Sequence, residues 1–224
     1  MKFASTHVPP ANQSPLNYQN TEFSCVPTSF ENALLYLLGR SEYRPELVKV
    51  INVHALDISD VRFIKKDGRT ALGKTSKSVY EVGSGGTSNE SIDTICKNLD
   101  IYKKNNFDPL SCQYIQGDQV NANTLKEKLT NQNTVALTNV QLGKIGHYVL
   151  ITKADRKHAY IFDPYFIHNS KEFNTKNVKI INDHIFEYNR KVPLTHLFQQ
   201  ESTDYMMGKN PRREMVFLSY DLSR

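Results

Sequence analysis

The stretch at 19–38, QNTEFSCVPTSFENALLYLL, constrains the fold most, because it places a cysteine at the start of an amphipathic helix. Pro27 suits the first turn, where its missing N–H would have no helical partner, and Gly39 is a typical stop. Cys25 then lies at the helix N-terminus, where unpaired N–H groups and the helix dipole favour a thiolate. This stretch alone fits a nucleophile and a buried cap residue equally well. One apolar stripe at helical spacing predicts packing on a core; its members are Phe30, Ala33, Leu34, Leu37 and Leu38.

A second stretch, at 145–164, predicts a β-hairpin that carries a histidine and an aspartate. The β-rich runs at 148–152 and 158–162 flank a polar turn. His147 stands before the first run and Asp163 ends the second, so an antiparallel pair brings the two side chains together. We expect Asp163 to accept the Nδ1–H of His147, which leaves Nε2 for a thiol. With the helix-cap cysteine, this is the nucleophile, base and orienting group of covalent catalysis.

These residues resemble the papain-like cysteine peptidases, and most closely the bacteriocin-processing peptidase-like branch, which includes exporter domains that clip double-glycine leader peptides. In that branch a glutamine lies six positions before the cysteine, as Gln19 does before Cys25. The resemblance covers roughly residues 15–165. The other marks of the branch are Gly-His-aromatic-Val, Asp-Pro and Gly-Thr-Ser, which this chain carries at 146–149, 163–164 and 86–88.

The resemblance implies an α+β, papain-like fold, in which the cysteine helix packs against an antiparallel sheet that carries the histidine and the aspartate. It also implies acyl transfer through a thioester, with Cys25 as nucleophile, His147 as general base and then acid, and Asp163 as the orienting group. The Gln19 side chain and the backbone N–H of Cys25 would form the oxyanion hole. Val26 replaces the usual glycine after the cysteine, which leaves the substrate class open.

Three functions are consistent with this constellation. With water as the second acceptor, the chain is a cysteine peptidase or amidase, which is our first prediction. With an amine acceptor it is an acyl or peptidyl transferase, as in phytochelatin synthase-like relatives. The non-enzymatic alternative is a papain-like shell that binds a peptide without cutting it, although such relatives usually lack the cysteine or the histidine.

Composition and charge limit the classes of partner that we expect. The net charge is +5, the Lys and Arg residues are scattered and no nucleic-acid motif is present, so we predict a peptide or protein substrate and no nucleic acid. No apolar run is long enough to span a membrane, and the N-terminus lacks the apolar core of a Sec signal peptide. The histidines at 168, 184 and 196 show no ligand spacing, so we predict neither a metal nor a cofactor.

We expect one domain over residues 1–224, with an extended arm over about 1–16. The sequence carries no exporter membrane segment or nucleotide-binding domain, so a stand-alone peptidase or a delivered effector, such as a toxin, is expected. Three cysteines do not indicate a disulfide framework. The predicted location is therefore the reducing cytoplasm, or the exterior after export by a non-Sec route.

The middle of the chain predicts a helix at 87–99, capped by Thr87 and Glu90, followed by a loop at 100–120. Cys96 is expected to fill the core, and Cys112 to lie exposed in the loop. Other expectations are helices at 43–58 and 121–130, an insertion loop or short hairpin at 60–86, a strand at 134–140, a strand or short helix at 177–185, a helical turn at 194–199 and a returning strand at 215–220.

Overall fold

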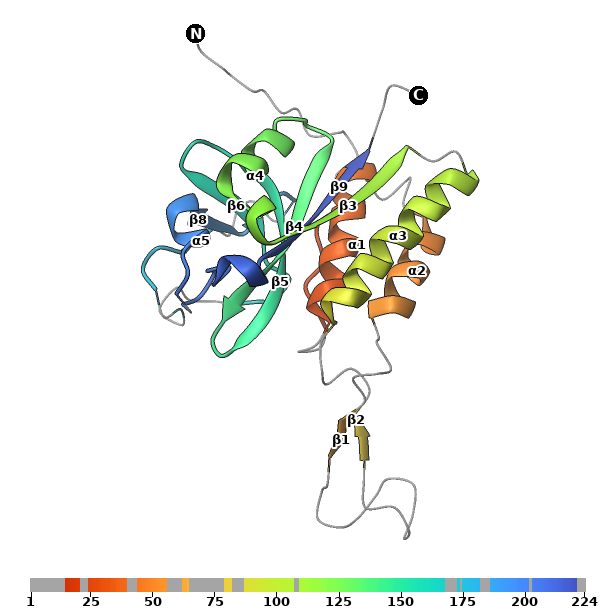
Figure 1. The fold of residues 1–224 in the computed structure, drawn as a ribbon, viewed down its shortest axis with the longest axis horizontal. Helices are drawn as coiled ribbons and strands as arrows, with labels where there is room; N and C mark the ends of the chain where they lie inside the picture. Colours follow the sequence, from red (N-terminus) through yellow and green to blue (C-terminus); the bar gives the residue numbers. More distant parts are fainter. Residues whose placement is uncertain are drawn as a thin grey trace.

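Three helices lie together on one side of a large sheet in the computed structural model of the chain (Figure 1). They are α1 (Cys25–Leu38), α2 (Pro45–Ala55) and α3 (Asn89–Asn106). None of the helices in the described part of the chain is long and apolar enough to cross a bilayer. The structure describes residues 15–20, 24–39, 44–55, 62–64, 79–81, 87–106, 109–167, 173, 175–181, 186–201 and 203–220.

The sheet has seven strands in the order β3-β9-β4-β5-β6-β8-β7, and every neighbouring pair is antiparallel. This confirms the predicted α+β class with an antiparallel sheet. The C-terminal strand returns to the sheet between two earlier strands, as the β-prone run at 215–220 indicated. The strands are β3 (Leu110–Gln116), β4 (Thr134–Leu142), β5 (Ile145–Ala154), β6 (His158–Phe162), β7 (Lys179–Ile180), β8 (Arg190–Pro193) and β9 (Glu214–Tyr220).

The two faces of the sheet bury two separate hydrophobic cores. Along β4, Val135 and Leu137 join the core under the helices, whereas Ala136 and Val140 join the core on the opposite face. This alternation follows from the period of two residues in a strand. Because β4 is apolar on both faces, it lies in the middle of the sheet with a layer on each side.

The prediction that the apolar stripe of α1 packs on a core is confirmed. Phe30 and Leu34 are fully buried against the sheet, and the Ser29 hydroxyl donates a hydrogen bond of 3.1 Å to the carbonyl of Tyr148 on β5. Gly39 ends the helix with φ of 70°, a conformation that favours glycine, and its N–H donates to the carbonyl of Leu35. The helix N-terminus is thereby fixed over the start of β5.

The middle of the chain differs from the prediction in two ways. Helix α3 continues to Asn106, and strand β3 follows it, so the predicted loop at 100–120 is wrong. The helix cap is Ser88, whose hydroxyl accepts from the N–H of Ser91, while the Thr87 hydroxyl donates to Ala55. Buried and exposed side chains alternate only weakly along β3, so its residues alone did not indicate a strand. The strand is stabilised by its pairing with β9.

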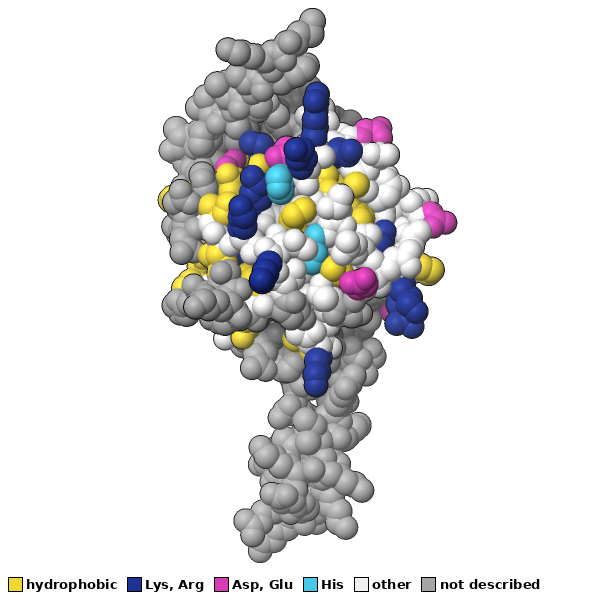
Figure 2. All heavy atoms as spheres, turned by 90° about the vertical axis from the view of Figure 1, so that its left-hand side faces the viewer, with side chains coloured by type: hydrophobic (Ala, Val, Ile, Leu, Met, Phe, Trp, Pro, Cys, Tyr) yellow, Lys and Arg dark blue, Asp and Glu magenta, His cyan; other side chains and the backbone are white. Residues whose placement is uncertain are grey.

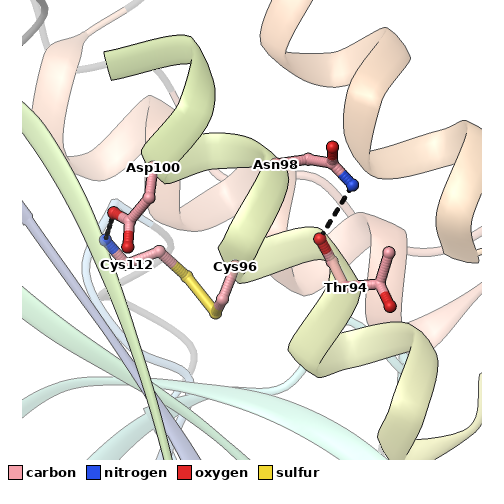
Figure 3. Close-up of a disulfide and its surroundings, with 5 residues drawn as sticks. All are labelled: Thr94, Cys96, Asn98, Asp100 and Cys112. Atoms are coloured by element: carbon pink, nitrogen blue, oxygen red, sulfur yellow. Dashed lines mark hydrogen bonds between the residues drawn. A yellow bond between two sulfur atoms is a disulfide. The ribbon is translucent and has the colours of Figure 1, made fainter. Parts of the chain in front are cut away.

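A disulfide between Cys96 and Cys112 joins α3 to β3 (Figure 3). Cys112 is buried, and its N–H faces the carboxylate of Asp100 at 3.4 Å. The predictions of an exposed Cys112 thiol and of no disulfide are therefore wrong. Simple counting of cysteines failed because the third one, Cys25, remains free.

The face opposite the three helices is covered by short elements and by the C-terminal segment. Helix α4 (Ala122–Lys128) is capped by Asn121, and α5 (Leu194–Leu197) follows β8. Figure 2 shows Lys and Arg side chains among polar and hydrophobic ones on the side of the molecule that carries β8 and α5. Two lysines, Lys153 and Lys191, lie over the ring of Tyr160, at 5.8 and 5.4 Å from its centre.

The remaining predictions lie partly outside the described residues. A short antiparallel hairpin pairs β1 (Arg62–Ile64) with β2 (Val79–Glu81), which confirms a hairpin within 60–86. Residues 1–14 of the predicted arm lie outside the described ranges, as does 182–185 in the tail. The helix predicted at 43–58 is confirmed within the described residues as α2. The helix at 121–130, the strand at 134–140 and the helical turn at 194–199 are confirmed with shifted ends, as α4, β4 and α5.

Candidate active site

Cys25 is the first residue of α1 and lies at the sheet, where the helix meets β5. Its side chain is 9% exposed, so the thiol is almost completely removed from solvent. The backbone N–H groups of Val26 and Tyr148 hydrogen-bond to the sulfur. The helix N-terminus thus provides one donor to the thiolate, as its position in the sequence predicted, and strand β5 provides the other.

His147 and Asp163 meet at the ends of β5 and β6, 2.6 Å apart. The atoms that meet are Nε2 of the histidine and Oδ1 of the aspartate, so the predicted pairing through Nδ1 is wrong. Which nitrogen faces the aspartate depends on the side-chain torsions χ1 and χ2 of the histidine, and sequence spacing does not determine them. His147 also hydrogen-bonds to Cys25, and Nδ1 is the nitrogen that remains for the sulfur.

Asp163 is completely buried, and the chain around it satisfies both of its carboxylate oxygens. Oδ1 accepts a second hydrogen bond from the N–H of Tyr165 at 2.7 Å, and Oδ2 accepts from the hydroxyl of Tyr205. Asn189 holds the backbone of Asp163 at both its N–H and its carbonyl, at 2.7 and 2.8 Å. Arg190 donates in turn to the Tyr205 hydroxyl at 3.1 Å. The carboxylate is therefore fixed in one orientation.

The surroundings of the thiol favour its ionised form. Burial opposes ionisation, but the hydrogen bond and the positive charge of His147, with the two backbone N–H groups, more than offset it. Together they lower the pKa of the Cys25 thiol below its usual value. The site therefore supports a thiolate beside an imidazolium.

The histidine is correspondingly basic. Burial favours the neutral ring, but the charge and the hydrogen bond of Asp163, with a further contribution from Cys25, raise the pKa of His147 to about 10. Burial also opposes ionisation of Asp163, and there the charges of His147 and Arg190, with two side-chain hydrogen bonds, lower the pKa of the carboxyl. The favoured state of all three groups is thiolate, imidazolium and carboxylate.

The segment that carries Gln19 is held between α1 and the end of β6. The fully buried Asn32 side chain on α1 binds both the N–H and the carbonyl of Asn17, at 2.7 and 2.9 Å. Two residues later, the N–H of Gln19 donates to the carbonyl of Pro164 at 2.9 Å. Gln19 therefore lies next to the strand end that carries Asp163, within the same local structure as the three ionised groups.

Comparison with known proteins assigns the chain to a family. The sequence model of the Peptidase_C39-like family matches residues 6–192. The chain belongs to this family. The predicted relationship to bacteriocin-processing peptidases is thereby confirmed. No curated protein matches the chain in a sequence search.

Solved structures of C39 peptidases are similar to this C39-like chain. One is the peptidase domain of Streptococcus ComA, a bi-functional ABC transporter involved in quorum sensing, with 12% identity, a TM-score of 0.44 and coverage of 92% of this chain and 98% of the other. Another is a C39-like peptidase of Bacillus anthracis, with 15% identity, a TM-score of 0.44 and coverage of 92% and 95%.

Sequence reasoning missed the residues of this C39-like chain that surround Asp163. Tyr205 and Arg190 lie in the C-terminal part that the sequence left without a role, and both are buried. Tyr205 has φ of 62°, and it is the only non-glycine residue with positive φ among those that the structure describes. A positive φ is unusual for a tyrosine, and here the tyrosine is buried against a buried carboxylate. This mark of a functional position is visible in the backbone and cannot be found in the sequence.

A cavity of about 310 Å³ reaches the residue before His147, although none of the three ionised groups lines it. The residue in question, Gly146, is part of its lining, and the cavity extends between the β4–β5 hairpin and the segment after α5. Its rim carries the cationic side chains of Lys209 and Arg212 and the anionic one of Glu201. Within the described ranges, no group of His, Cys, Asp and Glu side chains has the arrangement of a metal site.

Proposed function

We propose that the chain is a cysteine peptidase that cleaves a peptide or amide bond through a thioester. The observation that carries this proposal is the buried hydrogen-bonded series of Cys25, His147 and Asp163, in which the pKa of the thiol is lowered and that of the imidazole is raised. Membership of a peptidase-like family supports the same class of reaction.

The three side chains have complementary roles in the proposed reaction. The Cys25 thiolate attacks the carbonyl carbon, and the electron pair of the C=O bond moves to its oxygen. When the tetrahedral intermediate collapses, the C–N bond breaks and the amine takes the proton from Nδ1 of His147. Water then loses a proton to Nδ1 and attacks the thioester, the C–S bond breaks and the thiolate is restored. Asp163 holds Nε2–H throughout.

The oxyanion hole in this proposal consists of the Gln19 side chain and the backbone N–H of Cys25. Two features support it: Cys25 is at a helix N-terminus, and the segment of Gln19 is anchored at Pro164 and on α1. Donors at both places act on the negative charge that develops during attack.

The cavity beside Gly146 is the proposed place for a substrate side chain next to the cleaved bond. Its position fits, because Gly146 directly precedes the catalytic histidine. Its volume of about 310 Å³ is sufficient for one or two side chains and small for a folded segment. A substrate would therefore enter in an extended conformation.

The disulfide supports a second proposal, on where the enzyme works. A bond between Cys96 and Cys112 persists in an oxidising compartment, whereas the cytoplasm keeps most thiols reduced. We propose that the protein acts outside a reducing cytoplasm, which favours the predicted route of export over a cytoplasmic role.

The experiment that tests the function compares new protein N-termini in a proteome treated with the wild-type protein and with Cys25→Ala. We expect a defined set of new N-termini with the wild type and none with the variant. Cleavage by both proteins would overturn the assignment of Cys25. Retention of uncut peptides by both proteins, without cleavage, would show that the chain is a peptide-binding module.

A further inference from the structure

A carboxylic acid, Glu214, is buried on the helix side of the sheet and takes no part in the proposed chemistry. It lies on β9, is 2% exposed and accepts a hydrogen bond of 2.9 Å from the hydroxyl of Tyr114 on β3. The buried hydroxyl of Tyr148 faces the same carboxyl without a well-aligned hydrogen bond. Burial raises the pKa of Glu214, although hydrogen bonds from its neighbours lower it in part. A buried carboxyl is costly, which calls for a physical reason.

Asn139 on β4 connects this carboxyl to the catalytic histidine. Its Oδ1 accepts the backbone N–H of His147 at 3.1 Å, across the β4–β5 pair. The Asn139 side chain also favours the charged form of the Glu214 carboxyl, so Nδ2, the donor end of the amide, is directed at that carboxyl. The carboxyl therefore determines which way the Asn139 amide points, and the amide holds the backbone of His147.

Gly146 leaves the space that Asn139 occupies. A Cβ atom at this position would lie 2.9 Å from Oδ1 and 3.1 Å from Nδ2 of Asn139, closer than real Cβ contacts. The amide is at the end of a side chain and would have to move. A residue other than glycine before His147 would therefore displace the group that holds the histidine.

We propose that Glu214, Asn139 and Gly146 form a positioning unit that keeps His147 in reach of Cys25. Glu214 orients the Asn139 amide, Asn139 binds the His147 N–H, and the absence of a side chain at 146 makes room for the amide. This inference rests on the proposed function, because it explains how the base of that reaction is held. The unit holds the backbone of His147, whereas Asp163 holds its imidazole ring.

Two features separate this unit from a polar patch that only stabilises the core. Its contacts run across three adjacent strands, β9, β4 and β5, and end in the hydrogen bond that the backbone N–H of His147 donates. The Asn139 amide uses both of its ends, so a change at Glu214 affects His147 although the two side chains lie on different strands.

The test measures the rate at which iodoacetamide alkylates Cys25 as a function of pH, together with the thermal midpoint. Asn139→Ala should reduce the rate at pH 6 by about tenfold, because a displaced imidazolium lowers the thiol pKa less by about one unit. At high pH, where the thiol is ionised in both proteins, the rates should converge. Asn123→Ala on the surface of α4 serves as the matched control and should behave as the wild type.

A double-mutant cycle makes the test specific. Gly146→Ala alone should reduce the rate at pH 6 as Asn139→Ala does, and it should add little in the Asn139→Ala background, because the group it displaces is gone. Glu214→Leu should resemble Asn139→Ala, and Glu214→Gln, which keeps an acceptor oxygen, should restore most of the rate at pH 6.

The proposal is overturned if Asn139→Ala and Gly146→Ala leave the pH profile unchanged in folded protein, or if their effects simply add. A drop in the thermal midpoint with a normal pH profile also overturns it, since that result marks a stabilising role only. Failure of the proposed peptidase function would give a different result, because the alkylation rate of Cys25 in the wild type would then depend on pH as that of an ordinary thiol does.

Discussion

The two sides of His147 are built from different layers of the molecule and are held to different degrees. On one side, Cys25 comes from the helix layer and receives its hydrogen bonds from one backbone N–H at the helix start, one on β5, and the ring itself. On the other side, Asp163 is bound by Tyr165, Tyr205 and Asn189, all from beyond β6, with both carboxylate oxygens satisfied.

This difference shows how the molecule separates reactivity from orientation. The Asp163 carboxylate is held by more than one hydrogen bond, so several donors from the later part of the chain would have to move before it could turn. The thiolate is stabilised by the His147 ring and by two backbone N–H groups, one at the helix N-terminus and one on β5, so its charge is available for attack. The C-terminal part of the chain is thus an element of the site, although it contributes none of the three ionised groups.

The largest expected effect is on the thiol side. Gln19→Ala should slow turnover by about 10²–10³-fold, the usual cost of one oxyanion donor, with a small change in KM. Alkylation of Cys25 by iodoacetamide passes through no oxyanion, so its rate should stay near that of the wild type. The two rates should be measured on the same preparation, once a cleaved peptide is known. A parallel fall of both would show that Gln19 supports the thiolate and not the oxyanion.

The next effect concerns the stability of the helix layer. Cys112→Ala should lower the free energy of unfolding by roughly 3 kcal/mol, the value expected for a loop of about this length, because Cys96 lies 16 residues away. Urea unfolding of the oxidised proteins measures this, and the alkylation profile of Cys25 should not change. Denatured, unreduced wild type should show one reactive thiol per chain. Three thiols would contradict the disulfide.

A smaller effect is expected on the carboxylate side. Tyr205→Phe keeps the ring that packs against Phe173 and removes the hydroxyl that donates to Asp163. The loss of a donor to a buried charge should cost about 2 kcal/mol in the free energy of unfolding. Tyr160→Phe, which removes a hydroxyl that donates to the half-exposed Asp155, is the matched control and should cost less. Equal losses in urea unfolding would show that Asp163 is held no more firmly than a surface carboxylate.

The sequence predicted the parts of the molecule that local pattern decides. Helix α1 with its terminal cysteine shows a clear apolar period, and the β5–β6 hairpin shows two β-rich runs around a polar turn. Together they brought Cys25, His147 and Asp163 into one place. These elements are defined by residues close in the chain, so their spacing is informative without the rest of the fold.

The features that sequence reasoning missed depend on contacts between distant residues. Strand β3 reads as a loop because its pattern is weak, and it forms by pairing with β9 about a hundred residues later. The contact of Tyr205 with Asp163 and the Cys96–Cys112 bond likewise need the assembled sheet. The choice of Nε2 over Nδ1 depends on the side-chain torsions of His147, which no residue pattern specifies.

The most direct test of the central claim, that Cys25 and His147 form a thiolate–imidazolium pair, is the pH dependence of Cys25 alkylation. The lowered thiol pKa places the rise in rate below the pH at which an ordinary thiol ionises, and the rate should change again as His147 loses its proton at about pH 10. In His147→Ala, the buried thiol has no counter-ion, so the rise should move to about pH 8.5 or above. A single rise near pH 8.5 in the wild type, unchanged in His147→Ala, would contradict the ion pair.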